Sequence, residues 1–206
     1  MQLLSDNFSN GRPVPPGNAF GRPGHPVALS DNRSPHLAWT GAPPATRSFV
    51  LTCIDPDVPS RGDDVNQEGR TVPADLPRVE FAHWLMANIP AECGELAEGA
   101  CGEGIVPHGK REPHGPPGSV QGRNDYTGWF AGDPDMAGDY LGYDGPCPPW
   151  NDSIVHHYHF RIHALDVPAL DLRPGFTLAE LRAAMAGHVL SEAELVGTYA
   201  IRPVAG

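Results

Sequence analysis

The sequence predicts a single β-dominated domain, residues 1–206, with antiparallel sheets, long ordered loops and one α-helix near the C-terminus. Short apolar or alternating runs have the length of strands and end at prolines. Glycine and proline supply 24 residues each without a repeat period, which is typical of short strands joined by many turns. Only one segment combines helical spacing with a helix start signal. No linker or internal repeat divides the chain.

Composition narrows the classes of function. Apolar residues make up 40% of the chain, enough for a real core. The net charge is −11, with 14 basic residues against 25 acidic ones and a single lysine, Lys110. This balance argues against binding to nucleic acid or to an anionic membrane. It leaves a local anion site open, because histidines and backbone amides supply positive potential over a few ångströms.

Two buried strands are expected in the first half of the chain. Residues 49–54 form a continuous apolar run with β-branched members, which predicts a strand buried on both faces. The polar segment 55–69 that follows is predicted to be a loop. Residues 81–89 form the next strand, with Phe81, His83, Leu85, Ala87 and Ile89 on one face and the residues between them on the other. The lone His83 on this strand needs an explanation.

The segment 102–139 contains 14 glycines and prolines in 38 positions and has no strand or helix period. A structureless stretch of this length inside a domain is more often functional or specially packed than idle. Because it carries Tyr126, Trp129 and Phe130, we expect it to be ordered over the surface.

The predicted helix lies near the C-terminus. Thr177 and Glu180 have the spacing of a capping box, in which each side chain bonds the backbone amide of the other. An amphipathic face for docking on a sheet follows at near-helical spacing, formed by Leu178, Leu181, Met185 and Val189. Residues 191–194 are expected to begin a second short turn.

The run from Gly142 to Asp166 carries most of the functional information. It opens as a glycine-proline turn, in which Gly145 leaves backbone amides uncovered. It closes as a strand whose faces alternate. One face carries His156, Tyr158, Phe160 and Ile162, and the other carries His157, His159, Arg161 and His163. A histidine and a tyrosine leading an apolar face predict one wall of a small polar pocket.

Three segments with unusual polar chemistry could meet in that pocket. They contribute Asp55 and Asp57, His83, and the Gly145–Tyr158 run. A carboxylate beside an imidazole raises the histidine's affinity for its proton, so a protonated His83 or His156 could donate to an anion. There are plainer alternatives for each group. The two aspartates could shape a turn, and His83 could be a core histidine that bonds a backbone carbonyl.

Four stretches of the chain resemble the phosphatidylethanolamine-binding protein family, in particular its bacterial branch. They are DPDVP at 55–59, FAHWLMANIP at 81–90, GYDGPCPPWNDSIVHHYHFRIHALD at 142–166 and, more weakly, SPHLAWTGAPPATRSFVLTC at 34–53. Their matching order and spacing cover about residues 30–200. The DPD triplet alone would carry little weight.

The resemblance implies a β-sandwich with a C-terminal helix and a small cavity that accepts phosphate, acetate or a phosphoryl headgroup. The residues it places in the cavity are Asp55, Asp57, His83, Gly145, Pro146, His156 and Tyr158. The 102–139 insertion would pack beside the cavity mouth, so ligand preferences of the animal and plant members do not transfer. A homodimer is expected only at the level of the family.

The leading hypothesis is a non-enzymatic protein that binds a small anionic or phosphorylated ligand, without a cofactor. The alternative is an inhibitor or regulator of a protease or kinase that acts through surface loops. A hydrolase using an Asp–His pair is a third class. It is disfavoured because Gly-x-Ser-x-Gly is absent and Cys147 is flanked by prolines. No metal site is expected, since His157 and His159 lack a third ligand.

The N-terminal residues lack the basic and apolar regions of a signal peptide, and no stretch reaches the about 18 apolar residues of a transmembrane helix. We therefore expect a cytoplasmic protein. Its four cysteines form no CxxC pair, so all four thiols are expected to be reduced.

Overall fold

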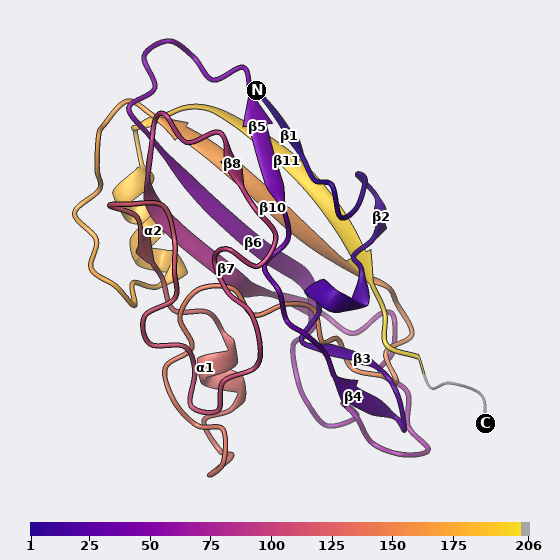
Figure 1. The fold of residues 1–206 in the computed structure, drawn as a ribbon. Coiled ribbons are helices and arrows are strands. Elements are labelled where there is room, and N and C mark those ends of the chain that lie inside the picture. The colour runs from indigo at the N-terminus through magenta and orange to yellow at the C-terminus, as the bar shows by residue number, and fades with distance from the viewer. Residues whose placement is uncertain (203–206) are drawn as a thin grey trace.

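The computed structural model describes residues 1–202, and a six-stranded sheet forms its centre (Figure 1). Neighbouring strands run antiparallel, apart from the parallel pair β11 and β2. In spatial order the strands are β2 (Arg12–Pro13), β11 (Val189–Tyr199), β10 (His156–Leu165), β6 (Ser48–Pro59), β7 (Arg78–Pro90) and β9 (Val120–Gln121). Three of the four long strands, β6, β7 and β10, contain the segments in which the sequence shows its strand patterns, whereas no such pattern predicted β11.

Smaller elements cover both faces of this sheet. The three-stranded sheet β1–β5–β8 packs on one face, and α2 (Leu178–Met185) covers the other (Figure 1). The remaining elements are β1 (Gln2–Leu4), β5 (Leu37–Thr40), β8 (Glu95–Leu96), the pair β3 (Gly21–Pro23) and β4 (Val27–Leu29), a 3₁₀ turn (Pro16–Asn18) and α1 (Tyr126–Trp129). The prediction of a strand-dominated fold with antiparallel sheets and a C-terminal helix is confirmed.

Strand β6 is buried on both faces, as predicted. Phe49, Leu51 and Cys53 pack into the core between the two sheets, whereas Val50 packs into the core under α2. The expectation that residue 55 begins a loop is wrong, because β6 continues to Pro59. The strand tolerates its prolines because the pairing with β7 is irregular between Asp55 and Val58.

A β-bulge places His83. Cys53 pairs with Trp84 and Ile54 pairs with Ala82, so His83 has no partner residue on β6. Bulges re-aim side chains in this way. The prediction that His83 shares a face with Leu85 is therefore wrong. Leu85 packs under α2, whereas the His83 ring lies 5.1 Å from the Tyr158 ring.

The C-terminal helix begins as predicted. Thr177 Oγ1 accepts from the Glu180 amide at 3.3 Å, and Glu180 Oε2 accepts from the Thr177 amide at 2.7 Å. Leu181 and Met185 dock on the sheet. This packing confirms the docking face up to Met185, where the helix ends. Val189, which was expected on the same face, instead begins β11 and is 42% exposed.

The turn expected at 191–194 is wrong, because this segment belongs to β11. On β10, Arg161 lies opposite Glu194 and His163 lies opposite Glu192. The pair of opposite charge, Arg161 and Glu194, stabilises the sheet, and no local pattern within 191–194 reveals it.

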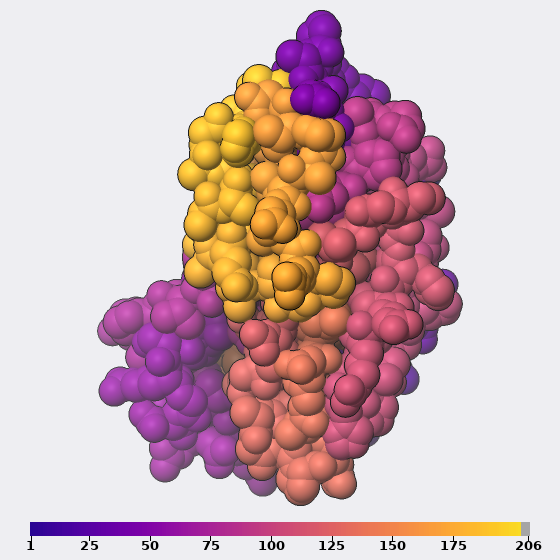
Figure 2. All heavy atoms as spheres, turned by 90° about the vertical axis from the view of Figure 1, so that its left-hand side faces the viewer, coloured from indigo at the N-terminus to yellow at the C-terminus, as the bar shows by residue number. Residues whose placement is uncertain are grey.

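The 102–139 segment is ordered and contains β9 and α1. Figure 2 shows the loop that follows β6 as a lobe at the lower left, with a recess between it and the neighbouring body of the protein. Within residues 1–202, no helix has both the length and the apolar character needed to cross a bilayer.

Candidate ligand-binding cavity

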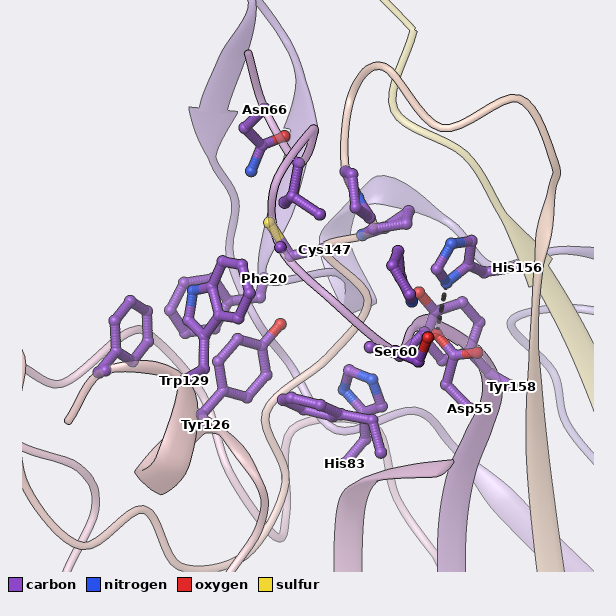
Figure 3. Close-up of a pocket in the computed structure, with 18 of the residues that line it drawn as sticks. Phe20, Asp55, Ser60, Asn66, His83, Tyr126, Trp129, Cys147, His156 and Tyr158 are labelled. Atoms are coloured by element: carbon purple, nitrogen blue, oxygen red, sulfur yellow. Dashed lines mark hydrogen bonds and ion pairs between the residues drawn. The ribbon is translucent and has the colours of Figure 1, made fainter. Parts of the chain in front are cut away.

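A cavity of about 560 Å³ opens at one end of the central sheet. Its walls come from the end of β6 with the loop that follows it, from β7, from the segment around α1, from residues 147–149 and from the start of β10. Segments far apart in the sequence therefore meet at one site (Figure 3).

One part of the cavity is aromatic. Phe20 stacks on Tyr126 with ring centroids 4.6 Å apart, and Phe130 stacks on the Tyr126 ring at 5.7 Å. Trp129 stands beside them and is 54% exposed (Figure 3). Three of these four residues belong to the 102–139 insertion, so the insertion packs beside the cavity as the family resemblance implied.

The other part of the cavity is polar and centres on His156. Its Nδ1 lies 2.7 Å from Asp55 Oδ2, and its Nε2 lies 3.1 Å from Asp152 Oδ2. Arg78 bonds both oxygens of Asp152, at 2.6 and 3.1 Å. Carboxylates only accept, so both ring nitrogens of His156 donate and the ring carries two protons.

The environment of His156 favours this charged form. Burial lowers the pKa of His156, but the bonds and charges of Asp55 and Asp152 outweigh burial, and the pKa is raised above its ordinary value. The four charged groups sum to zero, since Asp55 and Asp152 balance Arg78 and His156. Asp55 is also fully engaged, because its Oδ1 accepts from the Asp57 amide at 2.8 Å.

His83 differs from His156. Its Nδ1 lies 2.8 Å from the Asp144 carbonyl oxygen, so Nδ1 carries the proton and Nε2 faces the cavity (Figure 3). Burial lowers the pKa of His83 below its ordinary value, although Asp55 and the bond to Asp144 oppose this shift. The expected rise in proton affinity therefore occurs at His156 and not at His83.

Tyr158 brings a free hydroxyl to the cavity. The residue is fully buried, and its oxygen has no hydrogen-bond partner within residues 1–202. The neighbouring Tyr126 hydroxyl, by contrast, donates to the Gly145 carbonyl at 2.8 Å. Burial raises the pKa of Tyr158 well above its ordinary value, so its hydroxyl stays protonated and available as a donor.

Four of the seven predicted site residues line the cavity: Asp55, His83, His156 and Tyr158. Asp57 is not among the lining residues. The irregular pairing of β6 after Asp55 turns the Asp57 side chain to the outer side of the sheet, where its Oδ2 lies 2.8 Å from His157 Nδ1. The two carboxylates of the DPD triplet therefore bond histidines on opposite faces of β10.

Gly145 and Pro146 lie behind the cavity wall. The Gly145 amide donates to Asn32 Oδ1 at 2.8 Å and is not free for a ligand, and a Cβ on this residue would collide with the Asn18 carbonyl oxygen. The Pro146 carbonyl accepts from the Phe20 amide at 2.9 Å. Both residues shape the wall by packing.

Sequence reasoning missed several residues of the site. Arg78 and Asp152 complete the His156 cluster. Asp152 lies four residues before His156 in the sequence, whereas nothing in the sequence points to Arg78. Arg61, on the loop after β6, is the single arginine or lysine that lines the cavity within the described part of the chain. Phe20 lies in a turn-rich segment that gives no signal at all.

These features define a strand-dominated fold of packed sheets with a cavity at one end of the central sheet. A sequence model of the phosphatidylethanolamine-binding protein family matches residues 4–200. The chain belongs to this family, in the bacterial branch that also includes YbhB and YbcL.

Individual relatives agree over most of the chain. A UPF0098 protein of Methanothermobacter thermautotrophicus is 39% identical over 169 residues, covering 82% of this chain and 83% of the relative. YbhB of Escherichia coli is 30% identical and covers 97% of this chain and 99% of its own. The crystal structure of E. coli YbcL superposes with a TM-score of 0.70 at 27% identity, covering 97% of this chain and 98% of YbcL.

Proposed function

We propose that this protein is a non-enzymatic binding protein whose cavity takes a small anionic ligand, such as phosphate, acetate or a phosphoryl headgroup. The observation that carries the proposal is the buried Tyr158 hydroxyl, which has no partner within residues 1–202 and lies beside His83. A buried donor without a partner costs free energy. A ligand that accepts from Tyr158 removes this cost.

The affinity should be low. The charges of the His156 cluster cancel, and the other two polar side chains in this part of the cavity, His83 and Tyr158, are neutral. Anion binding then depends on one neutral donor, the Tyr158 hydroxyl, and on Arg61 at the cavity wall. We expect dissociation constants in the micromolar to millimolar range, about −8 to −4 kcal/mol.

A binding role fits the state of the other reactive groups. Burial raises the pKa of the Cys147 thiol to about 12, so it is not a nucleophile at neutral pH. Both nitrogens of His156 are engaged with carboxylates. All four cysteines are free thiols, which supports a cytoplasmic role for the protein.

Isothermal titration with phosphate and phosphoethanolamine tests the proposal. His83→Ala and Asp55→Ala should weaken binding at least tenfold, and His157→Ala, on the outer side of β10, should leave it within a few-fold. Circular dichroism must show that each variant is folded. Unchanged binding in both folded cavity variants would remove these residues from the site.

A second role rests on the cavity rim. Leu29 and Trp129 line the cavity mouth and are 65% and 54% exposed. Exposed apolar side chains of this size can anchor a protein partner. The protein would then regulate a protease or kinase through its loops. Inhibition assays with the wild type and Trp129→Ser test this role, which fails if the two proteins behave alike on every enzyme tried.

A further inference from the structure

We infer that the cavity selects oxyanions that still carry a proton, such as the monoanion of phosphate or of a phosphate monoester, over fully ionised ones such as sulfate. This inference rests on the proposed function and names the ligand class of the same site. It follows from the hydrogen-bonding roles that the structure assigns to His83 and Tyr158.

The first step concerns His83. The Asp144 carbonyl oxygen, 2.8 Å from His83 Nδ1, can only accept, so the ring proton sits on Nδ1. The Asp144 amide in turn donates to the His83 carbonyl at 3.1 Å. Two bonds between the same residues hold the ring in this orientation. The neutral ring then presents the bare Nε2 to the cavity as an acceptor.

A buried cluster keeps Asp144 in place. Its carboxylate accepts from Lys110 Nζ at 2.5 Å, from Asn32 Nδ2 at 2.7 Å and from Asn124 Nδ2 at 2.8 Å. The Asp144 and Lys110 side chains are only 1% and 9% exposed. The only lysine of the chain therefore helps to fix the residue that sets the proton position of His83.

His83 and Tyr158 thus offer the cavity one hydrogen-bond acceptor and one donor side by side. His83 Nε2 accepts and the Tyr158 hydroxyl donates, with their rings 5.1 Å apart. A protonated oxyanion matches both, because its O–H donates to His83 and an anionic oxygen accepts from Tyr158. Sulfate has no O–H at neutral pH and would place an oxygen against the lone pair of Nε2.

Phosphate monoesters and phosphodiesters differ in whether a phosphorus oxygen can carry a proton. A phosphate monoester has a second pKa of about 6, so a large fraction is protonated near that pH. A phosphodiester, as in an intact phospholipid headgroup, carries no proton on phosphorus oxygens. The cavity should therefore favour free phosphate and monoesters over diesters.

The test is isothermal titration of the wild type at about pH 6, where monoesters are half protonated. The probes are inorganic phosphate, phosphoethanolamine as the monoester, glycerophosphoethanolamine as the diester, and sulfate. We expect phosphate and phosphoethanolamine to bind at least tenfold more tightly than the other two. Their affinity should fall by up to tenfold per pH unit above the second pKa of the ligand. Sulfate or the diester binding within threefold of phosphate would overturn the inference.

Two variants separate affinity from selectivity. Tyr158→Phe should weaken all four probes by a similar factor, since this hydroxyl donates to any anionic oxygen. His83→Ala should bring the four affinities within a few-fold of each other. If a folded His83→Ala protein keeps the tenfold preference, His83 is not the source of the selectivity and the inference is wrong.

Nitrogen-15 NMR of the His83 ring gives a readout without any variant. We expect Nδ1 to be protonated and Nε2 to be bare, both in the free protein and with phosphate bound. An Nε2–H tautomer in the free protein, or a doubly protonated ring in the complex, would refute the inference while leaving anion binding itself intact. If the expected tautomer is present but none of the four probes binds, the proposed function fails and the selectivity falls with it.

Discussion

The two faces of β10 carry the same chemistry at different depths. On the inner face, His156 Nδ1 lies 2.7 Å from Asp55, and on the outer face His157 Nδ1 lies 2.8 Å from Asp57. The inner side chains are 0% and 1% exposed, whereas the outer ones are 49% and 22% exposed. Two adjacent histidines of β10 thus pair with the two aspartates of one DPD triplet. One of these pairs is buried and the other is solvated.

Depth decides what each pair does. Water screens the outer pair, and exposed ion pairs contribute about 0–1 kcal/mol. The inner pair belongs to a cluster with Asp152 and Arg78 that water hardly reaches. Removing one member of such a cluster leaves an uncompensated buried charge, which costs about 3–5 kcal/mol. The ion pair on the inner face therefore stabilises the cavity, whereas the pair on the outer face lies in solvent and contributes little to stability.

The largest expected effect on stability comes from replacing His156 and His157 by alanine, one at a time. His156→Ala should lower the free energy of unfolding by about 3–5 kcal/mol, because the buried Asp55 loses its charged partner, although Asp152 keeps Arg78. His157→Ala should lower it by less than about 1 kcal/mol. Urea denaturation of both variants measures the contrast. Equal losses would mean that burial does not distinguish the two pairs.

The buried pair should also give the stability a dependence on pH. The pKa of His156 in the folded protein is raised above its ordinary 6.5. Its stabilisation is then complete below about pH 6.5 and is lost as the pH rises through the folded pKa, at up to about 1.4 kcal/mol per pH unit. The difference in unfolding free energy between wild type and His156→Gln should shrink over this range.

His83 gives the free energy of unfolding the opposite dependence on pH, so the pH range of this measurement matters. Its lowered pKa gives stability that is present above about pH 6.5 and lost as the pH falls toward the folded pKa. Measurements from about pH 6.5 upward therefore isolate His156. A wild type that gains stability relative to His156→Gln as the pH rises would contradict the assignment.

A smaller contrast lies within the cavity, between two tyrosine hydroxyls. Tyr158→Phe should leave the free energy of unfolding unchanged or raise it by up to about 1 kcal/mol, because its oxygen is buried without a partner within residues 1–202. Tyr126→Phe should lower it by about 1–2 kcal/mol, because the Gly145 carbonyl loses its donor. Thermal denaturation of the ligand-free variants tests the order. A larger loss in Tyr158→Phe would mean that this hydroxyl already has a partner.

The smallest effect is expected on the outer face. Glu194 accepts from Arg161 Nε at 2.5 Å and faces His159 Nδ1 at 3.0 Å, in a partly exposed setting. Glu194→Gln should change the free energy of unfolding by less than about 1 kcal/mol, and 1 M salt should reduce even this change. A loss of several kcal/mol that salt does not affect would show that the outer face is as demanding as the inner one.

Much of the fold follows from local patterns. The period of two along 156–163 correctly separates the inner from the outer side chains of β10, because each strand residue points opposite to its neighbour. The capping box at Thr177 and Glu180 gives the helix start for a similar local reason. Family motifs indicated seven site residues, and four of them line the cavity.

What period-two reasoning could not supply is the position of the bulges. One bulge turns His83 toward Tyr158, and another sends Asp57 away from Asp55. A bulge depends on how two strands pair, so neither strand's own sequence reveals it.

The sequence by itself determined three of the four long strands (β6, β7 and β10), the start of the C-terminal helix, the small number of basic residues and the polar groups available for a site, since each of these follows from composition or local spacing. Only the tertiary structure decided which of these groups meet and in what state. His83 is neutral because it is buried against the Asp144 carbonyl, and His156 is charged because Asp55, from a distant strand, and Asp152, from the loop before β10, both bond its ring. The proton position on an imidazole depends on neighbours within a few ångströms, and in this fold those neighbours are up to 101 residues away along the chain.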